Sequence, residues 1–427
     1  MILRQYVTGK LREVFENFGF EPLDTPAIEY AEVLEGKYGD EADKLIYKFE
    51  DRGGRRVGLR YDLTVPLSRV VGSYPDLVKP FKRYQIAPVW RAEKPQKGRY
   101  REFWQCDVDT VGSSNMMADA EVVDVAYDAL RRLGFTRFKT KINNRKVLAA
   151  IAEHVGIPHE QAGPVYRAID KLDKIGLEGV KEELTQAGLD EAVIVRLMDV
   201  LKIRGDTDVV LTELKAMLAP YSVGIQGITE LEELVRYIRW LGMSEGNFEV
   251  DFSMVRGLDY YTGPIFETVV EEPRIGSICG GGRYDNLVGL FTNRPTPATG
   301  ISLGLERIVD VLDELRLGGI PDAKTVTQVL VTVFGPDTMG ESLRVASQLR
   351  AADIHTEVYL GTDKLGSQLR YSSRKGIPFT VILGPEEVAT GKAVVKNMAT
   401  EEQVTVDLTE LVSYLLSQYG QYEGLLR

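Results

Sequence analysis

The sequence predicts an α+β fold in which an antiparallel sheet flanked by helices is interrupted by a helical insertion and followed by a C-terminal α/β domain. Three observations lead to this prediction. Strand-like alternation fills residues 57–109 and returns at Phe248, a helical period dominates between Ala118 and Leu241, and strands alternate with helices in the last hundred or so residues. A chain of 427 residues is long enough for roughly two to four domains.

The composition is that of an ordinary globular protein, because 44% of residues are apolar and 27% are charged. Disordered, collagen-like and coiled-coil chains are thereby excluded. No apolar run approaches the roughly 20 residues that span a bilayer, and the N-terminus lacks a secretory signal, so we expect a cytoplasmic protein with no membrane partner. The net charge of −11 disfavours broad nucleic-acid binding, but basic residues between Lys94 and Arg101 leave recognition of one folded RNA open.

Several common catalytic arrangements are missing from the sequence. Cys106 and Cys279 are the only cysteines, and we expect them to be reduced core thiols rather than disulfide or zinc ligands. The histidines, His154, His159 and His355, are scattered and form no Ser-His-Asp or Cys-His arrangement. Neither G-x-x-x-x-G-K-[ST] nor a helix-opening G-x-G-x-x-G occurs, so arginines on the antiparallel sheet would have to hold any nucleotide.

The N-terminal region is predicted to begin with an amphipathic helix over about residues 1–18, since apolar residues recur every three or four positions, and Gly19 would end it. An extended segment over 20–28 contains Pro22 and Pro26, which favours an edge strand. Three strands follow, in V-G-L-R-Y-D, F-K-R-Y-Q-I-A-P-V-W-R and E-F-W-Q-C-D-V-D. Their alternation indicates antiparallel pairing with one polar face, which does not suit a Rossmann fold.

The middle of the chain is predicted to be helical from Ala118 to about Leu241, before Phe248, Val250 and Phe252 resume the strand pattern. An insertion of roughly 100 residues should be a domain of its own. Beyond the linker L-G-G-I-P-D-A-K-T, strands are expected at 329–334, 356–360 and 379–383 and helices at 340–352 and 364–375. This order implies right-handed crossovers and a mixed or parallel sheet.

Residues 90–109 carry the most informative motif, two antiparallel strands joined by a basic loop. Arg91 and Glu93 should share one face of the first strand. One face of the second strand would carry an aromatic ring, an amide and two carboxylates, namely Phe103, Gln105, Asp107 and Asp109. This face could be a platform for a charged ligand, with arginine for a phosphate and the aromatic ring for a base. A solvated sheet face with cross-strand ion pairs is the alternative.

Three later motifs also combine glycine with charged residues. In M-V-R-G-L-D-Y-Y-T-G, Arg256 could meet developing charge and two tyrosines could fix a polar substrate, or the tyrosines could alternate between core and surface while Asp259 caps a turn. In C-G-G-G-R-Y-D, three glycines could line a ligand floor or form a hairpin. In A-T-G-I-S-L-G-L-E-R-I-V, Arg307 near a helix start could meet an anion, or pair with Glu306 or Asp310.

Together these motifs resemble the class II aminoacyl-tRNA synthetases and, within them, the histidyl-tRNA synthetase family. Residues 91–109 are similar to the second class motif, A-T-G-I-S-L-G-L-E-R is similar to the third, and Pro26 matches the proline of the dimer-forming first motif. R-G-L-D-Y-Y and G-G-G-R-Y-D resemble the two histidine signatures. The resemblance implies a homodimer with a catalytic domain at 1–143 and 247–320, a helical insertion at 144–246 and an anticodon-binding domain at 325–427.

The resemblance also implies activation of L-histidine by ATP to a histidyl-adenylate and transfer to histidine tRNA, with Mg²⁺ bridging the outer phosphates and no side chain assigned to the metal. The implied catalytic residues are Arg91, Arg256 and Arg307. Arg91 would hold the α-phosphate, Arg307 the γ-phosphate, and Arg256 the α-phosphate and substrate carboxylate, where sister enzymes place a metal. Glu93 would bind the adenine side and Phe103 would stack on adenine. The implied histidine-binding residues are Asp62, Thr64, Arg91, Gln105, Asp109, Arg256, Tyr260 and Tyr261.

Two departures and two rival functions accompany this resemblance. The family usually begins with a leading segment of roughly 15 to 20 residues that carries Gly-Thr-Arg-Asp, and we expect its absence here to affect the dimer interface. Asp62 stands where many relatives have glutamate. One rival is an inactive paralogue serving as a regulatory subunit of ATP phosphoribosyltransferase; the three arginines and the C-terminal domain argue against it. The other is a synthetase for another amino acid, which R-G-L-D-Y-Y disfavours. The insertion could close over the acceptor stem or serve only as a packing block.

Overall fold

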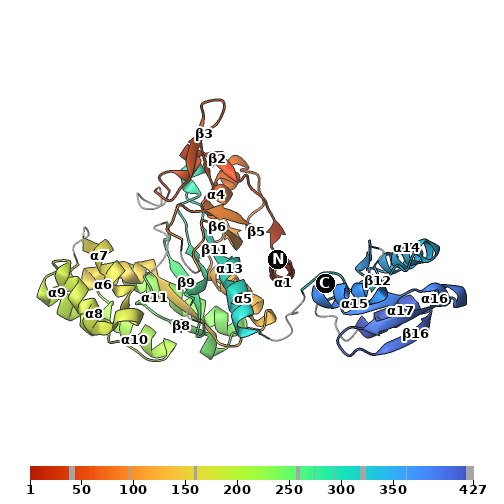
Figure 1. Ribbon diagram of the computed structural model, residues 1–427. Helices are drawn as coiled ribbons and strands as arrows, with labels where there is room; N and C mark the ends of the chain where they lie inside the picture. Colours follow the sequence, from red (N-terminus) through yellow and green to blue (C-terminus); the bar gives the residue numbers. More distant parts are fainter. Residues whose placement is uncertain are drawn as a thin grey trace. The chain divides into compact units, whose positions relative to one another are not determined.

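The computed structural model describes residues 1–37, 44–95, 98–157, 161–255, 260–273, 275–292, 294–317, 324–361 and 363–419, with only the backbone of Asp173. The chain divides into two compact units (Figure 1). The larger contains residues 7–317, and the smaller contains residues 318–427 together with the first six residues. Within the described ranges, no helix is both long and apolar enough to cross a membrane.

The larger unit is built on a sheet that has eight strands among its described residues, in the order β1-β5-β6-β11-β10-β9-β7-β8. The strands are β1 Glu21–Pro22, β5 Phe81–Trp90, β6 Glu102–Val111, β7 Phe138–Asn144, β8 Phe248–Val250, β9 Pro264–Val270, β10 Ser277–Arg283 and β11 Ala298–Gly304. All neighbours are antiparallel except at the two edges, where β1 pairs with β5 and β8 with β7 in parallel. The predicted antiparallel sheet is therefore confirmed, with its short proline-containing strand at an edge.

A second, smaller sheet and a set of helices complete this part of the unit. The sheet has the order β2-β4-β3, with β2 Ile28–Tyr30, β3 Lys48–Glu50 and β4 Arg56–Leu59. The helices are α1 Ile2–Asn17, α2 Ala31–Leu34, α4 Thr64–Ser73, α5 Met116–Arg132, α12 Gly289–Thr292 and α13 Leu305–Leu315. Helix α5 packs against β6, β10 and β11, the strands that were expected to carry chemistry. It therefore supports these strands through its apolar face.

The insertion between β7 and β8 is helical, as predicted (Figure 1). Its elements are α6 Arg145–Val155, α7 Ala162–Ile169, α8 Leu172–Gln186, α9 Glu191–Val200, α10 Thr207–Met217, α11 Ser222–Trp240 and the 3₁₀ turn η2 Glu245–Asn247. The prediction that helical character dominates from Ala118 to about Leu241 missed residues 138–144, which form strand β7. In F-K-T-K-I-N-N, buried Phe138, Thr140 and Ile142 alternate with half-buried lysines, which is the two-residue period of a strand.

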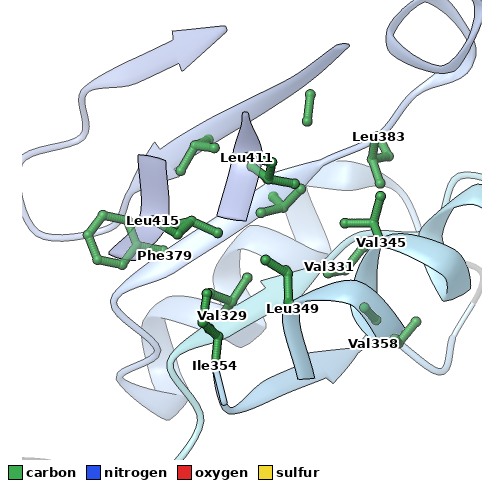
Figure 2. Close-up of a cluster of buried hydrophobic side chains, with 14 of the residues drawn as sticks. Val329, Val331, Val345, Leu349, Ile354, Val358, Phe379, Leu383, Leu411 and Leu415 are labelled. Atoms are coloured by element: carbon green, nitrogen blue, oxygen red, sulfur yellow. The ribbon is translucent and has the colours of Figure 1, made fainter. Parts of the chain in front are cut away.

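The smaller unit is an α/β domain with a mixed sheet, as predicted. In the described residues its strand order is β13-β12-β14-β15-β16, where the first three strands are parallel and the last two are antiparallel. The elements are β12 Val329–Val331, α14 Pro336–Ala351, β13 Thr356–Val358, α15 Leu365–Lys375, β14 Phe379–Ile382, α16 Pro385–Thr390, β15 Lys392–Asn397, β16 Gln403–Asp407 and α17 Leu411–Tyr419. Figure 2 shows its core, in which strand residues such as Val331 and Phe379 pack with Leu349 and Leu415 from helices. This unit thus has a hydrophobic core of its own.

Candidate active site

A pocket of about 440 Å³ lies along the centre of the eight-stranded sheet, within the size range of small-molecule sites. Its lining comes from β6, β9, β10 and β11, from the starts of α4 and α13, and from the loop after β5. Ten of the predicted site residues line it: Asp62, Thr64, Arg91, Glu93, Phe103, Gln105, Asp109, Tyr260, Tyr261 and Arg307. Arg256 and Asp259 lie outside the described residues. Gln105 and Ser302, which are 197 residues apart in sequence, therefore meet in one pocket because β6 pairs with β11.

The polar face of β6 forms the floor of this pocket. Alternate residues of the strand, from Phe103 to Asp109, line the pocket, whereas the intervening Cys106 and Val108 are fully buried on the other face. Asp107 and Asp109 are each only 3% exposed. The alternative of a solvated sheet face is therefore wrong, since these carboxylates lie at the bottom of a cavity.

Glycines on the neighbouring strands make room for the Asp109 carboxylate. Gly300 of β11 lies directly opposite Asp109, and a Cβ at Gly300 would lie 2.1 Å from Asp109 Oδ1. Gly281 of β10 is equally tight, because its Cβ would lie 2.1 Å from the Gly300 carbonyl oxygen. The glycine run of β10 thus belongs to a pocket wall in the middle of the sheet rather than to a hairpin turn.

Asp109 is held from two sides. Arg83, opposite it on β5, places Nη2 2.8 Å from Asp109 Oδ2. The Tyr284 hydroxyl donates to Asp109 Oδ1 over 2.5 Å. Burial raises the pKa of Asp109, while the Arg83 guanidinium and the Tyr284 hydrogen bond oppose that rise. Burial also raises the pKa of Tyr284, so its hydroxyl remains a donor at neutral pH.

Asp62 and Gln105 present unused acceptors to the pocket. Asp62 Oδ1 accepts from the backbone N–H of Val65 in the first turn of α4, over 3.2 Å. The Gln105 side-chain amide donates to Ser302 Oγ over 3.0 Å. Among the described residues, Asp62 Oδ2 and Gln105 Oε1 have no hydrogen-bond partner. Burial raises the pKa of Asp62 to about 7, against the opposing effect of Arg91. Two buried acceptors are thus available to a ligand that carries N–H donors.

The predicted nucleotide end is arranged around Arg91 and Phe103. Arg91 Nε donates to the Tyr61 carbonyl oxygen over 2.9 Å, and its guanidinium lies 5.0 Å from the centre of the Phe103 ring. Glu93 forms a long ion pair of 3.8 Å with Arg99 across the loop. A guanidinium beside an aromatic ring matches what a phosphate and a base require.

Arg307 points toward the loop and β10 from the first turn of α13. Its Nε donates to the Gly98 carbonyl oxygen over 3.0 Å, and its Nη1 donates to the Ser277 carbonyl oxygen over 2.5 Å. Glu306, proposed as a possible ion-pair partner, instead accepts from the backbone N–H of Trp104 over 2.9 Å. Residues 98–104 are thus tied to the start of α13.

Three tyrosines form the remaining wall. The rings of Tyr260 and Tyr261 meet edge to face with centres 4.6 Å apart, and Tyr260 meets Tyr284 in the same manner at 5.6 Å. Burial raises the pKa of both Tyr260 and Tyr261, so both hydroxyls are neutral donors and acceptors at neutral pH. This cluster can contact a polar ring without adding charge.

The sequence did not identify every residue of the site. Arg83 was missed because it is a single cation in a predicted strand with one apolar face. A charged residue in such a strand is expected to point to solvent. Tyr284 was present in the quoted G-G-G-R-Y-D motif but was given no role, and Gly300 gave no signal beyond being small. Cys106 and Cys279 are both free and buried, as predicted, although Cys279 also lines the pocket.

The described histidines do not line the pocket. Of the two histidines within the described ranges, His154 meets Tyr221 edge to face in the helical insertion, and the His355 ring is hydrogen-bonded to the Val326 carbonyl oxygen in the smaller unit. His159 lies outside the described residues. Within those ranges, no group of three histidine, cysteine or acidic side chains could hold a metal ion.

Comparisons with known proteins agree on one family. The model of the family "Histidyl-tRNA synthetase" matches residues 3–308, and the model "Anticodon binding domain" matches residues 328–418. A histidine–tRNA ligase of Aeropyrum pernix is 46% identical over 414 residues, which cover 96% of this chain and 94% of the relative. The crystal structure of histidyl-tRNA synthetase from Nostoc sp. PCC 7120 matches with a TM-score of 0.86 at 33% identity, covering 97% of this chain and 95% of the other.

A further solved structure bears on the rival function. It is a Bacillus halodurans C protein described as an ATP phosphoribosyltransferase regulatory subunit/histidyl-tRNA synthetase. It matches with a TM-score of 0.72 at 24% identity and covers 86% of this chain and 92% of its own. At that identity the likeness concerns the fold alone.

Proposed function

Because the chain belongs to the histidyl-tRNA synthetase family, we propose that it joins L-histidine to histidine tRNA through a histidyl-adenylate, consuming ATP and releasing AMP and pyrophosphate. It is thus a class II aminoacyl-tRNA ligase. One observation carries the assignment to this site: a single pocket collects residues from the second and third class motifs and both histidine signatures. Histidine-dependent exchange of pyrophosphate into ATP, with the other amino acids as controls, tests it. Exchange with histidine alone is expected, and exchange with a different amino acid would overturn the substrate.

The order of side chains along β6 supports a direction for the adenylate. Same-face residues of a strand are about 6.6 Å apart, so Phe103 and Asp109 occupy opposite ends of the floor with Gln105 between them. We place adenine on Phe103 with Glu93 beside it, and the histidine ring near Asp109. The reacting carboxyl and α-phosphate groups then lie between, within reach of Arg91.

The arginines supply the electrostatic part of the proposed mechanism. Attack of the histidine carboxylate on the α-phosphate builds negative charge on the phosphate oxygens, and a preorganised donor to such charge is worth about 2.7 to 4 kcal/mol. We assign Arg91 to the α-phosphate and Arg307 to the γ-phosphate, with Mg²⁺ between the outer phosphates.

Arg256 completes the proposed catalytic set by its match to the histidine signature, although it lies outside the described residues. Arg256→Ala should reduce adenylate formation by about 100- to 1000-fold, as for the loss of a comparable donor. Thermal unfolding of the variant should match that of the parent protein. Near-normal exchange by a folded variant would remove Arg256 from the mechanism.

Histidine recognition is proposed to use the buried acceptors and the tyrosine hydroxyls. Asp62 Oδ2, Gln105 Oε1 and Thr64 would receive the ammonium group, since Asp62 lies in the field of Arg91 at the reacting end. Asp109 would accept one ring N–H, and a hydroxyl of Tyr260 or Tyr261 would bond the other ring nitrogen. An amino acid without those ring nitrogens leaves buried polar groups unpaired, which disfavours it by roughly 10⁴-fold or more.

The remaining domains are proposed to handle tRNA. The catalytic domain would comprise residues 1–143 and 247–320, the insertion at 144–246 would close over the acceptor stem, and residues 325–427 would read the anticodon. Trimming the insertion should weaken tRNA charging more than adenylate formation; equal losses would argue for a packing block. Deleting the C-terminal domain should abolish anticodon discrimination while adenylate formation stays measurable.

We also propose a homodimer in the cytoplasm, where charged tRNA is used. Exposed apolar side chains gather on the small sheet that follows Pro26, with Ile28, Tyr30 and Phe49 each about half exposed. Such a patch is typical of an interface between subunits. Sedimentation at several protein concentrations tests this, and a monomer throughout would contradict it.

The regulatory-subunit function is less well supported. The relatives that reach 46% identity are histidine–tRNA ligases, whereas the protein with the dual description shares only the fold. Arg91 and Arg307 line the pocket. Histidine-dependent exchange by the purified chain separates the two functions directly, because a paralogue without catalysis would show none.

A further inference from the structure

Arg83 is a fully buried cation directly behind the pocket floor. It lies on β5 in register with Asp109 on β6, and its Nη2 approaches Asp109 Oδ2 to 2.8 Å. The same nitrogen donates to the Leu63 carbonyl oxygen over 3.1 Å. Its Nε and Nη1 have no hydrogen-bond partner among the described residues. Burying a guanidinium with unused donors costs free energy of folding. This indicates that the charge of Arg83 stabilises the ionised forms of the surrounding carboxylates.

In the part of the chain that the structure describes, those carboxylates are more numerous than the buried cations that face them. Asp62, Asp107 and Asp109 are each at most 3% exposed and all line the pocket. Arg83 acts on all three, whereas Arg91 is only half-buried and acts on Asp62. Asp107 Oδ1 also has no hydrogen-bond partner in the described ranges. The described part of the floor therefore holds three buried acids, and one fully buried arginine stabilises their ionised forms.

Burial raises the pKa of these acids. It raises the pKa of Asp107 to about 7, where Asp109 adds to the rise and Arg83 opposes it. It raises the pKa of Asp109 as well, again against Arg83. The groups that face Asp109 are Arg83 from β5, Asp107 from β6, Asp62 before α4, Tyr261 before β9 and Tyr284 after β10. Of these, Arg83 is the one cation, so its loss would favour the protonated acids.

We propose that Arg83 is a positioning residue for histidine recognition, which keeps Asp109 ionised and aimed into the pocket and offsets the charge of Asp107. This inference rests on the proposed function of the pocket. Arg83 does not line the pocket itself, so it acts through Asp109 rather than on the substrate. The consequence is selective: binding of the histidine ring depends on Arg83, and binding of ATP does not.

Three variants separate this role from simple core packing. Arg83→Met removes the charge at similar length, Asp107→Asn removes one neighbouring negative charge, and the double variant removes one charge of each sign. Lys82→Met is the matched control, because Lys82 is the adjacent residue of β5, points to the other face and pairs with Glu121 over 2.8 Å. KM for histidine, KM for ATP and kcat are measured by pyrophosphate exchange between roughly pH 6 and 9.

For Arg83→Met we expect KM for histidine to rise about 10- to 100-fold near neutral pH, with KM for ATP within about twofold. The acidic limb of its KM profile should move to higher pH, because Asp109 then needs a higher pH to ionise. Adding Asp107→Asn should recover about tenfold of the loss, since it removes the like charge beside Asp109. Lys82→Met should behave as the parent protein.

Equal losses for histidine and ATP, an unmoved pH profile, or no recovery in the double variant would overturn the proposal. If Arg83→Met does not fold, Arg83→Lys keeps the charge without the planar fork and should raise KM for histidine about three- to tenfold with KM for ATP unchanged. A KM for ATP that rises as much as the KM for histidine in that folded variant would equally overturn it. A parent protein without histidine-dependent exchange would instead refute the proposed function.

Discussion

One added methyl group at Gly300 should remove most histidine activation. An alanine Cβ there would lie 2.1 Å from Asp109 Oδ1 and 2.8 Å from the Val108 carbonyl oxygen. Ordinary contact begins near 3.4 Å. The carboxylate makes the closest of these contacts and must move by about 1.3 Å, and the backbones of β6 and β11 must also separate slightly to relieve the contact with the Val108 carbonyl oxygen.

A displacement of that size is large for a group that positions a substrate. Misplacement by about 1 Å can cost about 100-fold in rate, or about 2.7 kcal/mol of transition-state stabilisation. We therefore expect kcat/KM for histidine in Gly300→Ala to fall about 100-fold, while KM for ATP changes less than about threefold.

The assay is pyrophosphate exchange at varied histidine, with thermal unfolding measured on the same samples. Gly9→Ala in α1 is a matched control, since a Cβ at Gly9 would meet nothing within 4 Å and alanine suits a helix interior. A folded Gly300→Ala protein with kcat/KM within about threefold of the parent would refute the steric argument and the role of Asp109.

Three further predictions concern stability, pH and ATP. Asp119→Ala leaves the buried Arg283 without its main partner, so the free energy of unfolding of the larger unit should fall by about 3 to 5 kcal/mol in urea titrations; a loss below about 1 would contradict this. Because burial raises the pKa of Asp62 to about 7 and only its ionised form accepts the ammonium group, KM for histidine should rise as pH falls from about 8 to about 6. A flat profile in the parent protein would exclude that role. Phe103→Ala should raise KM for ATP about 10- to 100-fold by loss of base stacking, with KM for histidine little changed, and unaltered ATP binding would exclude the stacking.

Local spacing predicted most of the fold and much of the site. Alternation along residues 103–109 placed an aromatic ring, an amide and two carboxylates on one face, because side chains of a strand alternate whatever its partners are. Strand β7 was missed because its seven residues lie between two helical stretches. A two-residue period over so short a segment is hard to distinguish from the 3.6-residue period on either side.

Local sequence patterns could not predict which distant strands would pair. Nothing near Asp109 indicates that Gly300 lies against it or that Arg83 is buried behind it, since both depend on which strands become neighbours. The identity of the partner strands decides whether a single arginine faces water or a cluster of acids. Order among the motifs, rather than any one motif, carried the family resemblance that implied the candidate site residues, but that resemblance did not include Arg83 or Gly300.

The pairing of β6 with β11 also governs how the protein can fold during its synthesis. Gln105 and Ser302, which hydrogen-bond across these strands, are 197 residues apart. At about 5 to 20 residues per second, a ribosome needs roughly 10 to 40 seconds to make the intervening chain. During that interval β6 can pair with β5 but has an open edge on its other side. The helices α6 to α11 emerge meanwhile and can form from local contacts, whereas the acidic floor stays uncovered until residues 298–304 arrive. Aggregation of nascent chains should therefore be most frequent for those that stall before Ala298.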